Sequence, residues 1–281
     1  MDLPICRTCG VQYNTTRFDP HECKICADER QYVGWDGQQW TTLAELREEG
    51  YRGILREETA GLWGIGTDPS FAIGQRALLV PGPGGAVMWD SVTYLDDETI
   101  SAVAERGGIA AIAVSHPHYY SCVVEWSQAF GDVPIYLHAA DRDWACRDGN
   151  VVFWEGDTLE ILPGRTLINC GVHFDGGTVL HWADGAAGRG ALCSGDIFQV
   201  VNDRRYVSFM YSYPNLIPES PAVIERALRL VEPFGFDVIY GAWWRRVVRA
   251  DAKAALARSA RRYLDRLSAP PRAAGDVIAP Q

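Results

Sequence analysis

The segment from Ile109 to Ser121 constrains the fold of this chain most, because a strand-like apolar run in it ends in two histidines. The run is β-prone, and His116 and His118 follow it on either side of Pro117. Side chains two residues apart on an extended segment point the same way, so these two imidazoles can bind one metal ion. On this segment alone, a pair of loop histidines that only form hydrogen bonds is an equal alternative, because H-x-H is a weak motif.

Two further potential metal ligands stand next to strand-like stretches. His173 lies in a glycine-rich turn between two of them, and Asp196 follows the short apolar run that begins at Ala191. Neutral imidazoles with one carboxylate are a ligand set expected for Zn²⁺ or non-haem Fe²⁺. The sequence therefore predicts one site made of His116, His118, His173 and Asp196.

The order of these residues resembles that of the metallo-β-lactamase-fold hydrolases. That superfamily carries H-x-H-x-D-H after a strand, then a histidine in a glycine-rich turn, a metal-bridging aspartate and a late histidine. His116 and His118 match the H-x-H, His173 matches the third histidine, and Asp196 matches the bridging aspartate.

The resemblance covers roughly residues 60–245, including Val87–Asp90, which is similar to the family's strand that ends in a structural aspartate. It implies an α/β fold, a four-layer αββα sandwich. We expect this domain to span residues 36–268, after a small module at residues 1–35. The Pro/Ala-rich tail, residues 269–281, is expected to be disordered.

Three positions depart from the family pattern. Tyr120 and Ser121 stand where the motif has aspartate and histidine, and Trp243 stands in place of the late histidine. In the family, these positions complete a second metal site. Phenol and hydroxyl are poor ligands at neutral pH and indole is none, so we expect one metal and no second site.

Two C-x₂-C pairs near the N-terminus predict a zinc-ribbon-like module. Cys6 with Cys9, and Cys23 with Cys26, can each wrap one side of a tetrahedral ion. We expect a structural zinc here. Two disulfides are a minor alternative, and a rubredoxin-like iron centre, which would suggest electron transfer, is another.

Composition narrows the class of protein. The net charge of −10 argues against a general nucleic-acid binder. No stretch approaches the ~18 apolar residues of a membrane span, and the first residues do not resemble a secretory signal. We therefore expect a cytoplasmic protein with a small-molecule substrate and no nucleic-acid or membrane partner, and leave a homo-oligomer open.

The retained ligands predict a hydrolase with one metal, zinc in the leading hypothesis. A metal-bound water would attack a small ester, thioester, lactone or amide. Asp196 is the candidate general base, and Tyr120 is a candidate proton or oxyanion donor. An aromatic wall is an equal alternative for Tyr120.

Aromatic residues in two late loops are candidates for substrate binding. Tyr211 and Tyr213 lie in one loop and Trp243 in the other, although each suits a hydrophobic core equally well. Arg205 is a candidate for holding a substrate carboxylate or phosphate, although paired arginines are more often solvated surface.

Two other functions also fit the sequence. Two histidines and an aspartate also suit a mononuclear iron oxygenase, the chemistry of the persulfide dioxygenases in the same superfamily. Loss of the second-site ligands also fits a non-catalytic binding protein, but the four retained first-site ligands argue against such decay.

Overall fold

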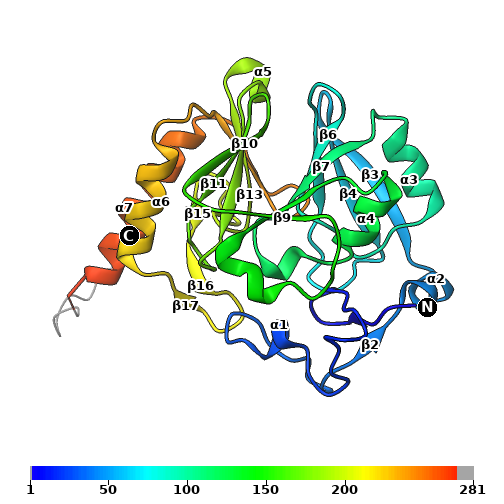
Figure 1. Cartoon of the computed structure of the whole chain (residues 1–281). Coiled ribbons are helices and arrows are strands. Elements are labelled where there is room, and N and C mark those ends of the chain that lie inside the picture. Colours follow the sequence, from blue (N-terminus) through cyan, green and yellow to red (C-terminus); the bar gives the residue numbers. More distant parts are fainter. Residues whose placement is uncertain (1, 271–281) are drawn as a thin grey trace, which may run out of the picture.

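A computed structural model describes residues 2–270, and it forms two β-sheets that face each other (Figure 1). The seven-stranded sheet has the order β3-β4-β5-β6-β7-β8-β9 and the six-stranded sheet has the order β10-β11-β12-β13-β18-β19. Both sheets are mixed, because β6 to β9 run parallel and β13 pairs with β18 in parallel.

The first sheet is formed by residues 52–154. Its strands are β3 (Arg52–Thr59), β4 (Leu62–Asp68), β5 (Ala77–Val80), β6 (Ala86–Trp89), β7 (Ile109–Ala113), β8 (Ile135–His138) and β9 (Val151–Trp154). Its helices are α3 (Asp97–Ala104) and α4 (Val123–Ala129), with the short 3-10 helices η1 (Pro117–Tyr119) and η2 (Ala139–Trp144).

The second sheet comes from the second half. Its strands are β10 (Thr158–Leu162), β11 (Arg165–Asn169), β12 (Thr178–Trp182), β13 (Ala191–Gly195), β18 (Val238–Gly241) and β19 (Val247–Val248). The helices are α5 (Gly185–Gly188), α6 (Pro221–Val231) and α7 (Ala252–Ser268). Two small hairpins are formed by β14 (Gln199–Val200) with β15 (Val207–Ser208) and by β16 (Met210–Ser212) with β17 (Ile217–Pro218).

Three buried clusters hold the layers together. One, which includes Trp89 and Trp182, brings together side chains of the two sheets. A second joins the first sheet to residues of α3 and α4, including Val103 and Trp126, and a third joins the second sheet to residues of α6 and α7. The expected four-layer αββα sandwich is thus confirmed.

The N-terminal module packs on the first half of the sandwich. It contains β1 (Ile5–Cys6), α1 (Lys24–Ala27) and β2 (Trp40–Thr41), and α2 (Leu43–Glu48) follows. Because β1 pairs with β2, the contacts of the module reach Thr41, beyond the boundary expected after residue 35. Its buried residues belong to the same cluster as the first sheet.

The division into residues 1–35, 36–268 and 269–281 stays a prediction. Helix α7 ends at Ser268, and residues 271–281 of the expected tail lie outside the described residues.

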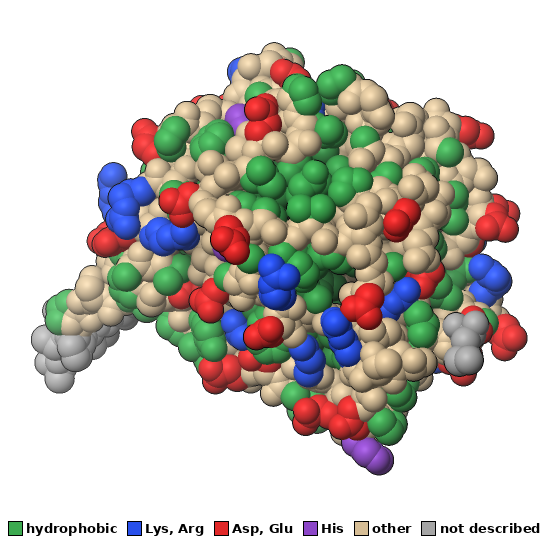
Figure 2. All heavy atoms as spheres, in the orientation of Figure 1, with side chains coloured by type: hydrophobic (Ala, Val, Ile, Leu, Met, Phe, Trp, Pro, Cys, Tyr) green, Lys and Arg blue, Asp and Glu red, His purple; other side chains and the backbone are tan. Residues whose placement is uncertain are grey.

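On the face shown in Figure 2, hydrophobic side chains gather near the centre and charged ones are scattered around them. None of the helices within residues 2–270 is long and apolar enough to cross a membrane.

Candidate metal centre

The two histidines of the H-x-H stand directly beyond β7. Strand β7 ends at Ala113, and His116 keeps an extended backbone with φ −170° before η1 begins at Pro117. This proline suits the first position of a helical turn, because it needs no backbone donor there. Both imidazoles are buried, with relative exposures of 1% and 4%.

Close contacts around Ser115 tie β6 to β7 and bring the ends of the two sheets together. The Asp90 carboxylate accepts a hydrogen bond from the Ser115 N–H at 2.8 Å, and the Thr178 N–H donates to the Ser115 oxygen at 2.9 Å. Gly195 lies so close that a Cβ there would be 2.8 Å from Ser115 Oγ. This close approach is what places Asp196, just after β13, beside the end of β7.

His173 joins the other two histidines from a turn with a left-handed backbone, φ 68°. A histidine rarely adopts this conformation. The buried carboxylate of Glu219 accepts the His173 N–H at 3.0 Å, and the Tyr211 oxygen accepts a hydrogen bond from His173 Nδ1 at 2.7 Å. These two bonds fix the turn and leave Nε2 of His173 pointing into the site.

The three imidazoles form a cluster whose ligand atoms all lie within 4.8 Å of one another. Nδ1 of His116 lies 2.9 Å from Ser115 Oγ, which leaves its Nε2 free. Nδ1 of His118 lies 3.1 Å from Nε2 of His173. Two nitrogens on a tetrahedral ion with bonds of about 2.0–2.1 Å lie about 3.3 Å apart, so this spacing fits shared coordination.

Asp196 lies beside this cluster, with its Oδ1 at 3.5 Å from Nε2 of His116. That distance is too long for a good hydrogen bond. Within residues 2–270, His116 Nε2 and Asp196 Oδ1, which face each other, are buried without a hydrogen-bond partner. Buried polar atoms are rarely left unpaired, and a cation among them would satisfy them, so the residues fit a metal ion.

The protonation of the site suits metal binding. Burial lowers the pKa of His116 and His118 well below the usual value and that of His173 to about 4, so all three are neutral ligands at neutral pH. Burial also raises the pKa of Asp196 to about 7. A cation beside Asp196 would favour its carboxylate form.

None of the three residues that depart from the family motif directs a polar atom at the histidine cluster through the bonds it makes. The Ser121 hydroxyl accepts a hydrogen bond from Gln75 Nε2 at 3.0 Å, and Trp243 Nε1 donates to the Ile73 oxygen at 3.1 Å. Tyr120 lines a small separate cavity with Val11. Across the described range, the groups of three or more clustered potential ligands are the three histidines and the four cysteines.

The phenol in the site is that of Tyr119, so the expectation for Tyr120 is revised. The Tyr119 ring lies 4.4 Å from the His116 ring, and its hydroxyl is buried without a partner in the described chain. Burial, with Asp196 nearby, raises the pKa of Tyr119 well above its usual value. The 3-10 turn of η1 points residue 119 into the site and residue 120 toward the N-terminal module.

A cavity of about 390 Å³ adjoins the cluster. Of the four residues expected to bind substrate, Tyr213 and Trp243 line it. Tyr211 instead contacts His173 through its backbone oxygen. Arg205 is exposed, pairs with Asp203 at 2.7 Å and lines a different surface depression, so its expected role does not fit its position.

The arginine at the cavity is Arg30, from the N-terminal module, which sequence reasoning missed. Its guanidinium lies 3.9 Å from the centre of the Phe174 ring and pairs with Asp28 at 2.6 Å. No local pattern signals this position, because Arg30 reaches the site only when the module is folded onto it.

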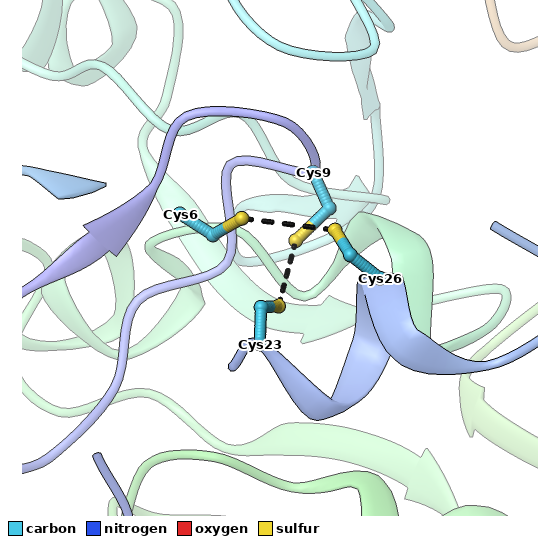
Figure 3. Close-up of side chains that lie close together, drawn as sticks. All are labelled: Cys6, Cys9, Cys23 and Cys26. Carbon is cyan, nitrogen blue, oxygen red and sulfur yellow. Dashed lines mark hydrogen bonds between the residues drawn. The ribbon is translucent and has the colours of Figure 1, made fainter. Parts of the chain in front are cut away.

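The four cysteines of the module converge on one point (Figure 3). Cys6 and Cys26 sulfurs are 3.7 Å apart, and Cys9 and Cys23 sulfurs are 3.6 Å apart. These are too long for disulfides and close to the edge of about 3.8 Å of a tetrahedron with 2.3 Å metal–sulfur bonds. The cluster therefore fits a tetrahedral metal ion.

Hydrogen bonds and burial favour a cation among these sulfurs. Gln38 Nε2 donates to Cys6 Sγ at 3.3 Å, and the Tyr13 hydroxyl lies 3.1 Å from Cys23 Sγ. Burial raises the pKa of the Cys9 thiol well above its usual value. Four thiolates would therefore not persist together here without a positive ion.

Comparisons with known proteins agree with this geometry. No model of a known protein family matches the sequence. The metallo-β-lactamase DIM-1 has a TM-score of 0.57 at 12% identity, covering 77% of this chain and 99% of DIM-1. The metallo-β-lactamase FIM-1 from Pseudomonas aeruginosa, solved in its mono-zinc form, has a TM-score of 0.55 at 13% identity, covering 78% of this chain and 97% of FIM-1.

A much closer relative is the uncharacterized protein YmaE of Bacillus subtilis (strain 168). It is 49% identical over 270 residues, which cover 95% of this chain and 98% of YmaE. The chain therefore belongs to the family of YmaE, and its fold is that of the metallo-β-lactamases.

Proposed function

We propose that this protein is a metal-dependent hydrolase with one ion, zinc, at His116, His118 and His173. The observation that carries the proposal is the convergence of three buried, neutral imidazoles beside Asp196. His116 Nε2 and Asp196 Oδ1 lack hydrogen-bond partners among residues 2–270. Three protein ligands with an open position are typical of catalytic zinc sites.

A single ion suits this chain better than two. Tyr120, Ser121 and Trp243 replace the ligands of a second site, and each side chain contacts other parts of the fold. FIM-1, which shares the fold, was solved in a mono-zinc form, so one ion is compatible with the architecture.

A bound divalent ion supplies Lewis acidity, which lowers the pKa of water and stabilises negative charge on a carbonyl oxygen. The Asp196 carboxylate, beside His116, accepts the proton of the attacking water. The backbone oxygen of Asp196 accepts a hydrogen bond from the Tyr213 hydroxyl at 3.2 Å, which steadies this residue.

Tyr119 provides the remaining proton-donating group. Because its phenol stays protonated, its hydroxyl can donate a hydrogen bond to the developing oxyanion or to the leaving group. Ser115 and Tyr211 act through the ligands: their oxygens bond Nδ1 of His116 and of His173 and thereby orient the rings.

The cavity sets the size of the substrate. Its volume of about 390 Å³ lies at the lower end of small-molecule sites. Tyr213, Trp243 and Tyr32 offer aromatic surface, and Arg30 and Gln31 offer polar groups. We propose a small ester, thioester, lactone or amide as the substrate.

The test is a panel of these four substrate classes, assayed with zinc-loaded protein and with His116→Ala. Hydrolysis of at least one class that disappears in His116→Ala is expected. Equal rates in the two proteins, or no hydrolysis by fully loaded protein, would overturn the proposal. Oxygen uptake with a persulfide by iron-loaded protein would instead favour the oxygenase alternative.

A further inference from the structure

The N-terminal module forms one wall of the candidate active-site cavity. The segment Asp28–Tyr32 begins two residues after Cys26, and three of its side chains line the cavity: Arg30, Gln31 and Tyr32. Thr8, which lies between Cys6 and Cys9, lines it as well. Each C-x₂-C pair is thus within a few residues of a side chain that lines the cavity.

Hydrogen bonds hold this wall against the end of β16 and the turn that follows it. The backbone oxygen of Glu29 accepts hydrogen bonds from Ser212 Oγ and Asn215 Nδ2, both at 2.7 Å. The Glu29 carboxylate accepts a third from the Tyr211 hydroxyl at 2.8 Å. The two segments are separated by more than 180 positions in the chain, so the bonds form only when the module is docked.

The same contacts reach one ligand of the three-histidine site. The Tyr211 oxygen accepts the hydrogen bond from His173 Nδ1 that orients this imidazole. Arg30 lies over the neighbouring Phe174 ring at 3.9 Å, with Nη1 3.5 Å from the His173 oxygen. Glu29 therefore contacts Tyr211, which orients the His173 ring, and Arg30 contacts His173 and Phe174 themselves.

The module has little regular structure of its own. Strand β1 contains two residues and helix α1 contains four, while all four cysteine side chains are buried. In small modules of this kind, metal binding supplies the free energy of folding. The position of Asp28–Tyr32 therefore depends on an ion at the cysteines.

We infer that the four-cysteine module is a metal-dependent wall of the candidate active site. An ion at the cysteines holds Asp28–Tyr32 against the segment from Tyr211 to Asn215, and this contact keeps His173 placed for metal binding. The inference rests on the metal-binding part of the proposed function and not on hydrolysis.

Coupling between two sites is reciprocal at equilibrium. If an ion at the cysteines strengthens metal binding at the histidines, an ion at the histidines strengthens binding at the cysteines by the same factor. The inference thus predicts one coupling constant that can be measured from either side.

The test measures the release of Co²⁺ from the three-histidine site into excess chelator, by visible absorption, in protein with Zn²⁺ at the cysteines. The double variant Cys6→Ser/Cys9→Ser removes half of the cysteine ligands. We expect Co²⁺ release to be about tenfold faster, the lower end of the effect of losing support for a ligand.

A second variant keeps both metal sites intact. Ser212→Ala/Asn215→Ala removes both side-chain bonds to the Glu29 oxygen, and we expect Co²⁺ release to be several-fold faster than in the wild type. The matched control is Asn14→Ala, which breaks the bond of the module to Asp148 at 2.8 Å, away from the cavity, and should leave the rate unchanged.

Wild-type release rates in a folded Cys6→Ser/Cys9→Ser protein would overturn the inference. If that variant does not fold, a wild-type rate in Ser212→Ala/Asn215→Ala would do so. Hydrolysis enters none of these readouts, so a failed substrate panel with faster Co²⁺ release would count against the hydrolase and for the metal-dependent wall.

Discussion

Nδ1 of His173 donates a hydrogen bond to the Tyr211 backbone oxygen at 2.7 Å, while the His173 N–H donates to the Glu219 carboxylate at 3.0 Å. Together these bonds hold a histidine with φ 68° in a strained turn. The ligand is therefore positioned by two residues that do not themselves lie within the histidine cluster.

Glu219→Ala should therefore weaken metal binding without removing a ligand. We expect a loss of about tenfold in affinity at the three-histidine site, as for other residues that orient metal ligands. Competition titration with a zinc chelator measures the affinity. Glu219→Gln, which keeps an accepting oxygen, should lose less, and equal losses in the two variants would contradict this explanation.

Tyr119 and its neighbour Tyr120 should behave differently when their hydroxyls are removed. Tyr119→Phe is expected to lower kcat by about 10²-fold, the lower end for a lost proton donor, with the metal content unchanged. Tyr120→Phe, whose ring faces a separate cavity, should keep near-wild-type kcat. Steady-state assays on the substrate that the wild type hydrolyses measure kcat for both variants. A larger loss in Tyr120→Phe than in Tyr119→Phe would restore Tyr120 to the site.

Gly195 should tolerate no side chain. With φ 54°, an added Cβ would lie 2.8 Å from Ser115 Oγ and 3.1 Å from the Asp90 carboxylate. We expect Gly195→Ala to destabilise the fold by about 2–3 kcal/mol. Gly61→Ala is the matched control, because Gly61 has φ 81° with no atom near the added Cβ. This change should lower the free energy of unfolding by about 1 kcal/mol. Urea denaturation measures the free energy of unfolding of both variants. Similar decreases in the two would argue against a close approach at Gly195.

Asp141 should make stability fall as the pH rises. Burial raises its pKa to about 7, although the Gly176 N–H donates to its carboxylate at 2.9 Å. An unfolded aspartate has a pKa of about 3.9. The contribution of Asp141 to the free energy of unfolding is therefore fully present below about pH 4 and is lost as the pH rises through about 7.

Asp141→Asn removes this dependence while keeping an oxygen that can accept from Gly176. The stability of the variant relative to wild type should thus be greater at about pH 8 than at about pH 5. Urea denaturation of both proteins at the two pH values measures the difference. An offset that does not change with pH would show that Asp141 does not carry the effect.

Helices with clear caps could be predicted from the sequence, but the hairpin of β3 and β4 could not. The Asp96 carboxylate accepts the Thr99 N–H at 2.7 Å, which starts α3 where acidic residues precede an apolar face. Strand β4 instead contains Gly64 and Gly66, which strands usually avoid. A Cβ at Gly64 would lie 2.6 Å from the Trp244 ring, so a distant contact, invisible in the local pattern, requires glycine there.

The candidate site likewise has parts that the sequence predicts and parts that it does not. Cysteine spacing predicts the four-sulfur cluster, because each C-x₂-C pair is local and only one further contact must form. Tyr120 was the candidate because of its place in the motif, but the motif does not reveal how η1 turns, and Tyr119 lines the cavity. Arg30 was missed because it reaches the cavity through the docking of the module.

Elemental analysis of the purified chain counts the metal ions that the two clusters bind. The geometry predicts two metal ions per chain, one at the four cysteines and one at the three histidines. Removing His116 and His118 together should eliminate one ion, and Cys6→Ser/Cys9→Ser should eliminate the other. Three ions per chain, or two ions retained after the loss of both histidines, would rule out one ion at each cluster.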